Sequence, residues 1–337
     1  MRFLILLAFV ITPLTGWAQD RSATIQDVVE SHILPGFTRL ASASAALSQA
    51  AQADCAASSE GLRGAFNDAF DAWIGVSHLR FGPTETGNRA FALAFWPDPR
   101  SATPKALSAM IESEDPVVES ADAFQTVSIA ARGFYALEFL LYDPQISALG
   151  SGAYRCALIR AVAADIDNTA QAILTDWQDH YAALLISPEN SDVYRSEEEV
   201  LQELFKALTT GLQFTADTRL GRPLGTFDQP RPARAEARRA GRSLRHVQLS
   251  LIALRDLAQR LASISPEASA TLDAAFGQSL DLTERLDDPV FAGVADPQGR
   301  LRVEALQQSI GRIREIAATD LGPALGVAAG FNALDGD

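Results

Sequence analysis

Residues 59–80, SEGLRGAFNDAFDAWIGVSHLR, carry the pattern that decides the fold class. Their apolar side chains recur at steps of three and four residues, which gathers them on one face of an α-helix. Ser58 or Ser59 can cap the start of this helix, and Gly82-Pro83 ends it. The apolar face comprises Leu62, Phe66, Ala69, Phe70, Trp73 and Val76.

The same helical period extends over most of the chain, and no segment alternates convincingly in the manner of a β-strand. We therefore predict an all-α protein, with about eight main helices in two packed helical bundles. The expected organisation is a signal peptide over 1–18, an N-terminal helical part over 19–150 and a C-terminal bundle over 151–337. The expected helices cover about 25–37, with an interruption at Pro35-Gly36, then 59–80, 115–142, 154–185, 196–221, 247–261, a helix starting at 265, and 301–318.

The composition excludes several classes of protein. The chain has 337 residues, 47% of them hydrophobic, so it can bury a large core and is not mainly disordered. Its net charge is -14, which argues against nucleic acid and against anionic membrane surfaces as partners. The six arginines between residues 231 and 245 form either a patch for phosphate or an acidic partner, or a solvated face; we favour the solvated face.

The N-terminus resembles a secretory signal. Arg2 is followed by the apolar run 3–11, which Pro13 ends, and small residues stand before the expected cleavage site after Ala18. The run is too short to span a membrane, and no later segment is long enough and apolar enough to do so. We therefore expect a periplasmic protein without an integral membrane span.

The two cysteines, Cys55 and Cys156, are the only ones in the chain. In an exported protein two cysteines usually pair, so we predict a disulfide between them. Two separate buried thiols remain the alternative. The bridge would close a loop of about 100 residues and stabilise the fold by roughly 4 kcal/mol.

The most informative helix for function is 128–143, SIAARGFYALEFLLYD. It is almost wholly apolar, yet its polar residues recur at steps of three, three and four, which puts them on one face. A buried carboxylate is costly unless it is paired or ligated. The face is therefore either an internal network, with Arg132 or a tyrosine holding the glutamate, or a binding site. Its residues are Arg132, Tyr135, Glu138 and Tyr142, and Gly133 allows another backbone or a ligand to approach closely.

None of the standard enzyme motifs occurs in the chain. The four histidines are isolated, so the His-Glu-x-x-His pattern of zinc peptidases is missing. There is no phosphate-binding glycine loop and no Gly-x-Ser-x-Gly elbow.

Four segments together resemble the imelysins, a family that is classed among peptidases and includes iron-regulated bacterial surface and periplasmic proteins. They are ILPGF at 33–37, AW at 72–73 with HLRFGP at 78–83, FWPD at 95–98, and GFNALDGD at 330–337. The resemblance covers almost the whole mature chain. It implies a pair of four-helix-type bundles facing a central cleft.

The family's hallmark is Gly-x-His-x-x-Glu, and this chain departs from it at one position. Gly133 and Glu138 match, but Tyr135 takes the place of the histidine. Imidazole is the preferred zinc ligand, so the change weakens the case for zinc chemistry. Hard oxygen ligands suit Fe(III), which leaves two alternatives open: a ferric site at Tyr135 and Glu138, or a structural hydrogen bond between them. His78 could add a ligand, and Asn332, Asp335 and Asp337 of the C-terminal tail could fold onto the site.

The leading functional hypothesis is non-catalytic binding in the periplasm. The bound species would be a metal ion, with iron favoured over another divalent or trivalent metal as the cofactor, or a small ligand or peptide. The resemblance implies a role in iron uptake, with partners in the outer or inner membrane. The alternatives are a metallopeptidase, against which Tyr135 weighs, and a structural or interaction protein whose site has decayed.

Overall fold

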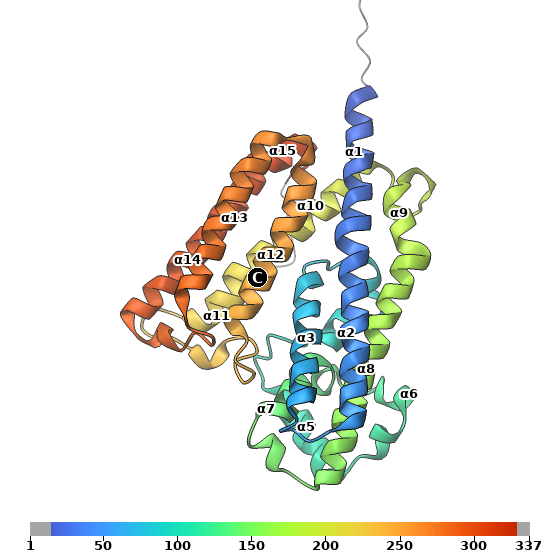
Figure 1. Ribbon diagram of the computed structural model, residues 1–337, viewed down its shortest axis with the longest axis vertical. Coiled ribbons are helices and arrows are strands. Elements are labelled where there is room, and N and C mark those ends of the chain that lie inside the picture. Colours follow the sequence, from blue (N-terminus) through green and yellow to red (C-terminus); the bar gives the residue numbers. More distant parts are fainter. Residues whose placement is uncertain (1–14, 329–337) are drawn as a thin grey trace, which may run out of the picture.

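The structure is a computed structural model that describes residues 15–328, with side chains from residue 21 onward. Within that range the regular elements are α-helices joined by 3₁₀ and π turns, and no β-strand occurs. Figure 1 shows the helices gathered into two groups. The prediction of an all-α fold of two packed bundles is confirmed.

The first bundle holds the segment from which the fold was predicted. Its helices are α2 (Leu34–Ala53), α3 (Glu60–Val76), α7 (Gly133–Tyr142) and α8 (Gly152–Asp176). α2 packs against both α3 and α8, and α7 packs against α8. All six apolar residues predicted for the 59–80 face are buried. The hydroxyl of Ser59 accepts a hydrogen bond from the backbone N–H of Leu62, as expected of a helix cap.

The second bundle lies beside the first (Figure 1). It consists of α10 (Glu197–Gln213), α12 (Ser243–Leu261), α13 (Pro266–Leu286) and α14 (Pro297–Ile316). α12 contacts both α3 of the first bundle and α10 and α13 of its own, so it joins the two. The expected division of the chain near residue 150 stays a prediction; α8, which follows that point, packs on α2 and α7, which precede it.

Shorter helices and turns complete the fold. The connection between α3 and α5 (Ala102–Ser113) contains α4 (Arg89–Leu93) and a cis Trp96–Pro97 peptide. π turns extend α8 into α9 (Ala182–Ile186), α10 into α11 (Gly221–Leu224) and α14 into α15 (Gly322–Leu325). No helix in the described range is long and apolar enough to cross a membrane.

The first helix is not interrupted at Pro35-Gly36, contrary to the prediction. α1 (Thr15–Val28) runs through a π turn at Val29–Ile33 directly into α2. Proline is tolerated there because it stands in the first turn of α2, just after the wider turn has already shifted the backbone hydrogen bonds. Gly36 permits the close approach of α3, since a Cβ at this position would lie 2.6 Å from Cγ1 of Val76.

The predicted 115–142 helix is broken into short pieces, but both of its ends are confirmed. Asp115 caps a 3₁₀ turn at Pro116–Glu119, and α7 ends at Tyr142. Ser120 and Ser128 each accept a backbone N–H bond, which starts a new turn: α6 (Ala121–Phe124) and a 3₁₀ turn. Gly133 then restarts the chain as α7 with φ of 73°. A Cβ at Gly133 would lie 2.2 Å from the carbonyl oxygen of Leu93, so the close approach expected here is made by the backbone of α4.

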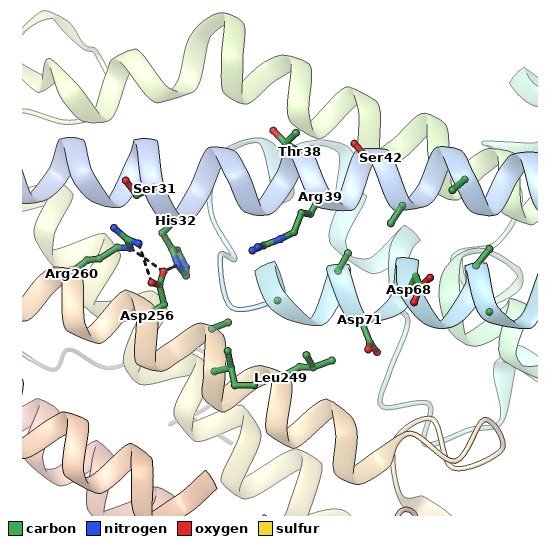
Figure 2. A pocket seen from close by; sticks show the side chains of 18 of the residues that line it. Ser31, His32, Thr38, Arg39, Ser42, Asp68, Asp71, Leu249, Asp256 and Arg260 are labelled. Carbon is green, nitrogen blue, oxygen red and sulfur yellow. Dashed lines mark hydrogen bonds and ion pairs between the residues drawn. The ribbon is translucent and has the colours of Figure 1, made fainter.

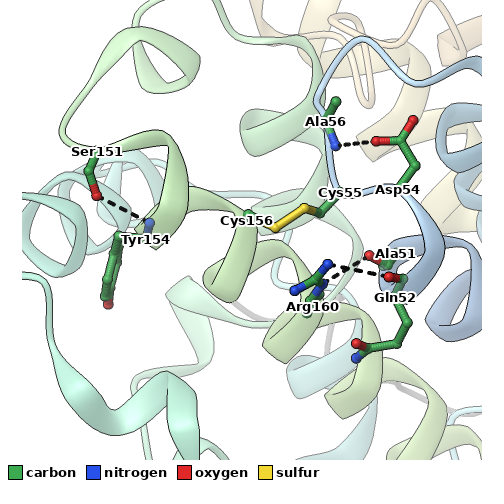
Figure 3. Close-up of a disulfide and its surroundings, with 9 residues drawn as sticks. All are labelled: Ala51, Gln52, Asp54, Cys55, Ala56, Ser151, Tyr154, Cys156 and Arg160. Carbon is green, nitrogen blue, oxygen red and sulfur yellow. Dashed lines mark hydrogen bonds between the residues drawn. A yellow bond between two sulfur atoms is a disulfide. The ribbon is translucent and has the colours of Figure 1, made fainter.

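The predicted Cys55–Cys156 disulfide is confirmed. It links the segment that follows α2 to the first turns of α8, with the two Cα atoms 5.2 Å apart (Figure 3). Arg160 supports the same junction, because its guanidinium donates to the backbone carbonyls of Ala51 and Gln52. The bridge therefore ties together two central helices of the first bundle.

Candidate functional site

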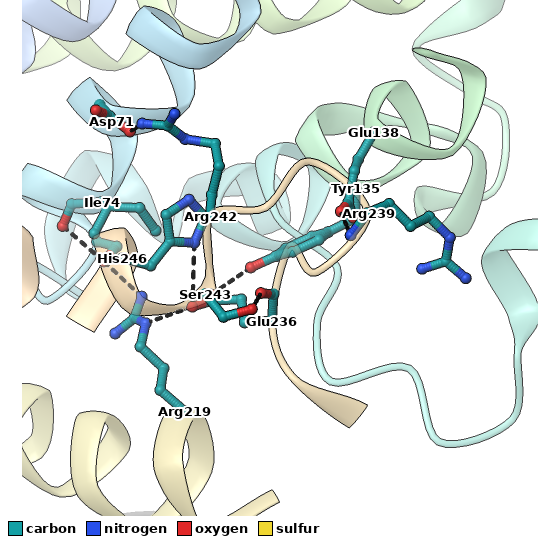
Figure 4. A network of polar contacts seen from close by, with 11 residues as sticks. Asp71, Ile74, Tyr135, Glu138, Arg219, Glu236, Arg239, Arg242, Ser243 and His246 are labelled. Carbon is teal, nitrogen blue, oxygen red and sulfur yellow. Dashed lines mark hydrogen bonds and ion pairs between the residues drawn. The ribbon is translucent and has the colours of Figure 1, made fainter. Parts of the chain in front are cut away.

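The polar residues of α7 form two adjacent buried sites rather than one. Tyr135 and Glu138 are 6% and 2% exposed, respectively. Both point toward the segment that precedes α12, but each has its own partner there (Figure 4). No hydrogen bond joins the two side chains, so the structural Tyr135–Glu138 hydrogen bond, one of the two alternatives left open, is not made.

Tyr135 belongs to a network centred on Glu236. Its hydroxyl donates to Oε1 of Glu236 at 2.5 Å, and Nε of Arg219 donates to Oε2 at 2.7 Å. Nδ1 of His246 lies 3.2 Å from the same Oε2, without the geometry of a hydrogen bond. All four side chains are buried. Three segments distant in sequence therefore converge on one carboxylate (Figure 4).

The network fixes the protonation of its members. Burial alone would raise the pKa of Glu236, but the charge of Arg219, with His246 and the Tyr135 hydroxyl, lowers it to about 2. Burial, together with the charge of Glu236, raises the pKa of Tyr135 well above 10. Glu236 is thus an ion-paired carboxylate and Tyr135 a neutral phenol that donates its proton.

Glu138 differs from Glu236 in having no positively charged side chain paired with it among the described residues. Its Oε1 accepts the backbone N–H groups of Arg239 at 2.8 Å and Ala240 at 3.1 Å, and no side chain is ion-paired with it. Arg239 instead pairs with Asp143 at 2.7 Å. Burial raises the pKa of Glu138 to about 7, against the opposing effect of the two backbone donors. Glu138 therefore changes its charge near neutral pH.

We expect Glu138→Gln to remove a pH dependence of stability. A folded-state pKa near 7, above the ordinary glutamate value of 4.5, means that the folded protein binds more protons than the unfolded chain between these values. Wild-type stability then falls as pH rises through this window. The glutamine keeps an oxygen for the two backbone donors, so the variant should match the wild type near pH 5. At pH 8 the free energy of unfolding of the variant, measured in urea, should exceed that of the wild type by on the order of 2 kcal/mol.

The control for this prediction is Glu315→Gln, an exposed glutamate paired with Arg312 on α14. It should change stability little at either pH. If the difference in unfolding free energy between Glu138→Gln and the wild type were the same at pH 5 and pH 8, it would contradict a raised pKa for Glu138.

A small pocket opens beside Tyr135 and Glu138. Its volume is about 280 Å³, close to the lower end of typical small-molecule pockets, about 300 Å³. Trp96 and Phe95 contribute apolar walls, and the Trp96 ring lies over Tyr135 with centroids 6.2 Å apart. Three arginines also line it: Arg222, Arg234 and Arg239. The pocket thus combines the two motif positions with a cationic rim.

The structure places Arg132 and Tyr142 away from this pocket. Arg132 lies before the first turn of α7 rather than on its face, and its guanidinium makes two hydrogen bonds to Asp165 of α8, at 2.9 and 2.7 Å. Tyr142 lies under the guanidinium of Arg63, 4.6 Å from the ring centroid. Neither residue holds Glu138, contrary to one of the alternatives drawn from the spacing.

His78 also lies apart from Tyr135 and Glu138. Its Nε2 is 2.9 Å from Nε2 of His32, and Nδ1 of His32 is 2.6 Å from a carboxylate oxygen of Asp256. Burial, with the charges of His32 and Arg219, holds the pKa of His78 well below its usual range. The histidine pair therefore links the segment after α3 to the π turn at Val29–Ile33 and, through Asp256, to α12, at the end of a different cavity.

That cavity is a cleft of about 1230 Å³ between the two bundles. α2 and α3 form one side and α12 the other, with His32, Asp256 and Arg260 at one end (Figure 2). Its charged lining is largely paired internally: Asp256 with His32 and Arg260, and Asp71 with arginines of the 231–245 segment. Much of the remaining lining consists of glycine and alanine. The cleft is larger than the pocket at α7, but it lacks the motif residues.

The 231–245 segment is only partly the solvated face that we expected. Arg242 pairs with Asp71, Arg239 with Asp143, and Glu236 is buried in the Tyr135 network. Arg234, Arg238 and Arg245 are exposed. The prediction of a solvated face is wrong for the other residues, because the segment covers α7 and supplies backbone and side-chain partners to that helix. The C-terminal candidates, Asn332, Asp335 and Asp337, lie outside the described residues.

A sequence model of the imelysin family matches residues 33–316. The chain belongs to the imelysin family. This imelysin is 24% identical over 313 residues to "Iron-regulated protein A" of Synechococcus elongatus, covering 87% of this chain and 83% of that protein.

Two solved structures share the imelysin fold. The crystal structure of an imelysin-like protein from Psychrobacter arcticum matches with a TM-score of 0.79 at 20% identity, over 97% of this chain and 100% of that one. That of a putative iron-regulated protein A precursor from Parabacteroides distasonis matches with a TM-score of 0.70 at 12% identity, over 89% and 95%. At these identities the likeness concerns the fold alone.

Sequence reasoning missed the partners that surround Tyr135 and Glu138 in the candidate site. Glu236 is the one acidic residue in the 231–245 segment, a signal that could have marked it as a paired group. Arg219 and Arg222 follow α10 with no comparable signal. Trp96 lies in the 95–98 segment, where its sequence context gives no sign that it would stand beside Tyr135.

Proposed function

We propose that this imelysin is an exported, non-catalytic binding protein linked to iron, and that it takes its ligand in the pocket beside Tyr135 and Glu138. The observation that carries this proposal is the position of the pocket. It opens at two positions of the family motif: Tyr135, where the histidine is replaced, and Glu138, where the glutamate is retained. Both side chains are buried and line the cavity. Its small volume favours a small ligand over a peptide.

A bare metal ion does not fit the residues of this pocket. The Tyr135 phenol keeps its proton and makes a hydrogen bond with it to Glu236, whose two oxygens are already engaged. One oxygen of Glu138 accepts two backbone N–H bonds, and the remaining charged lining is mainly cationic. Among the described residues no group of three or more His, Cys, Asp or Glu side chains could hold a metal ion. In this proposal iron is therefore cargo, not a resident cofactor.

The same contacts disfavour a metallopeptidase. Catalytic zinc sites use three protein ligands and an open position for water. At the motif position of the histidine, Tyr135 is instead a proton donor within an internal network. We propose the periplasm as the compartment and membrane components of iron uptake as partners, on the strength of the signal-like N-terminus and of the names of the relatives.

Blocking the pocket should abolish iron capture. Ala233 lines the pocket and is exposed, so Ala233→Trp should fold while filling the entrance. The measurement is equilibrium dialysis of the purified protein against ferric citrate, and separately against Fe(II) under anaerobic conditions. Wild type should retain about one equivalent of iron in at least one arm, and Ala233→Trp should retain little.

The matched control is Ala270→Trp, at an exposed alanine of α13 outside the pocket. It should bind as the wild type does. Failure of the wild type to retain iron in either arm, or equal retention by both tryptophan variants, would overturn the proposed function.

A further inference from the structure

The pocket at α7 contains cationic groups that have no partner of opposite charge among the described residues. No ion pair joins the guanidinium of Arg222 or of Arg234 to any described carboxylate, whereas the neighbouring Arg239 is paired with Asp143. Burial, followed by the charge of Arg234, lowers the pKa of Arg222, so the two cations lie close enough to repel. An anion between them would relieve this repulsion.

Two buried polar atoms at the same pocket also lack a partner. Nε of Arg222 is inaccessible to solvent and makes no hydrogen bond within the described part of the chain. Thr103, which is 1% exposed, lines the pocket, and its hydroxyl is likewise unpartnered there. Buried polar groups are normally satisfied, so a ligand atom in this pocket would supply a partner that the described part of the chain does not.

The acidic residues of the pocket do not neutralise the arginines. Both oxygens of Asp98 accept backbone N–H bonds, from Ala102 and Thr103 at 2.8 Å each, at the start of α5. Glu138 is held by the backbone of residues 239 and 240. The guanidinium of Arg222 instead lies over the ring of Trp96, 5.8 Å from its centroid, which fixes it against an apolar wall.

We propose that this pocket binds a small oxyanion-bearing molecule, a carboxylate or a phosphate, between Arg222 and Arg234, with Thr103 as a further hydrogen-bonding group. Iron would then enter only as part of an anionic complex. The inference rests on the proposed function, because it specifies the ligand of the same pocket.

The test is isothermal titration calorimetry with iron-free citrate and, in a second arm, inorganic phosphate, which separates the two sources of oxyanion. Wild type should bind at least one of them, with an affinity that falls as sodium chloride is raised. Arg222→Gln and Arg234→Gln should each weaken binding about tenfold or more, since each removes a charge-assisted contact. Both variants should keep the wild-type circular dichroism, because neither guanidinium is ion-paired with any residue between 21 and 328.

The matched control is Arg302→Gln. Arg302 is an exposed arginine of α14, and its substitution removes the same charge at a position far from the pocket in sequence. Its affinity should stay within about twofold of the wild type. Lack of binding of both anions, or equal weakening by Arg302→Gln, would overturn the inference. Retention of Fe(II) without any anion, blocked by Ala233→Trp, would overturn it and would show that a bare metal ion does fit the pocket, while sustaining the pocket's role in iron capture. Arginine-dependent citrate binding without retention of iron would sustain the inference and refute the iron link.

Discussion

Replacing Glu236 with alanine is expected to lower the free energy of unfolding by about 3–5 kcal/mol. The substitution leaves the guanidinium of Arg219, which is 4% exposed, without a counter-charge in the interior. It also removes the acceptor of the Tyr135 hydroxyl. A buried charge left unpaired costs far more than the pair itself contributes, which is why truncating one partner has so large an effect. Urea unfolding followed by circular dichroism at neutral pH measures the loss.

A second variant separates the unpaired charge from general damage to the core. Arg219→Met combined with Glu236→Leu removes both charges and should recover much of the lost stability, since apolar residues of similar volume can replace a buried pair. The control is Glu315→Ala, which breaks an exposed pair on α14 and should cost less than about 1 kcal/mol. A Glu236→Ala loss as small as that of Glu315→Ala would refute the buried network.

Removing the disulfide is the other change with a large expected effect. Cys55 and Cys156 are 101 positions apart, so the bridge strongly restricts the unfolded chain. In the chain-entropy account a loop of about this size contributes about 4–5 kcal/mol. The double variant Cys55→Ala with Cys156→Ala should therefore unfold at a clearly lower urea concentration than the oxidised wild type.

Reduction of the wild type provides the matched control for the disulfide. Wild type unfolded in the presence of a reductant should behave like the double alanine variant, because both lack the bridge. The reductant should leave the variant itself unchanged. A loss below about 1 kcal/mol in the variant, or insensitivity of the wild type to reduction, would show that the bridge does not constrain this fold.

The helices of this chain are largely predictable because most of them bury one continuous apolar face. The 59–80 segment places its apolar residues at helical spacing, and Ser59 caps it as expected. The failures lie where local backbone chemistry overrides the periodicity. The 115–142 segment breaks at Ser120, Ser128 and Gly133, which favour caps and a positive φ over a continuous helix. Pro35 was wrongly predicted to interrupt the helix because the π turn before it was not foreseen.

The burial of Tyr135 and Glu138 on one helix was predictable, but their contacts were not. Tyr135 and Glu138 were found from the motif and from their unusual polarity within an apolar helix. Their partners come from residues about 100 positions later, Glu236 and the backbone at 239 and 240, and no spacing rule links such distant segments. Arg132 was misplaced because it precedes α7, where helical spacing no longer applies.

The location of bound iron tests the central claim most directly. Crystals of the wild-type protein grown with ferric citrate should show an anomalous iron signal inside the pocket lined by Trp96, Glu138 and Arg222, with citrate oxygens facing Arg222 and Arg234. An iron signal on the His32–His78 pair, in the cleft between the bundles, or bound directly to Tyr135 and Glu138 without citrate would contradict the account. So would crystals with no iron in the pocket.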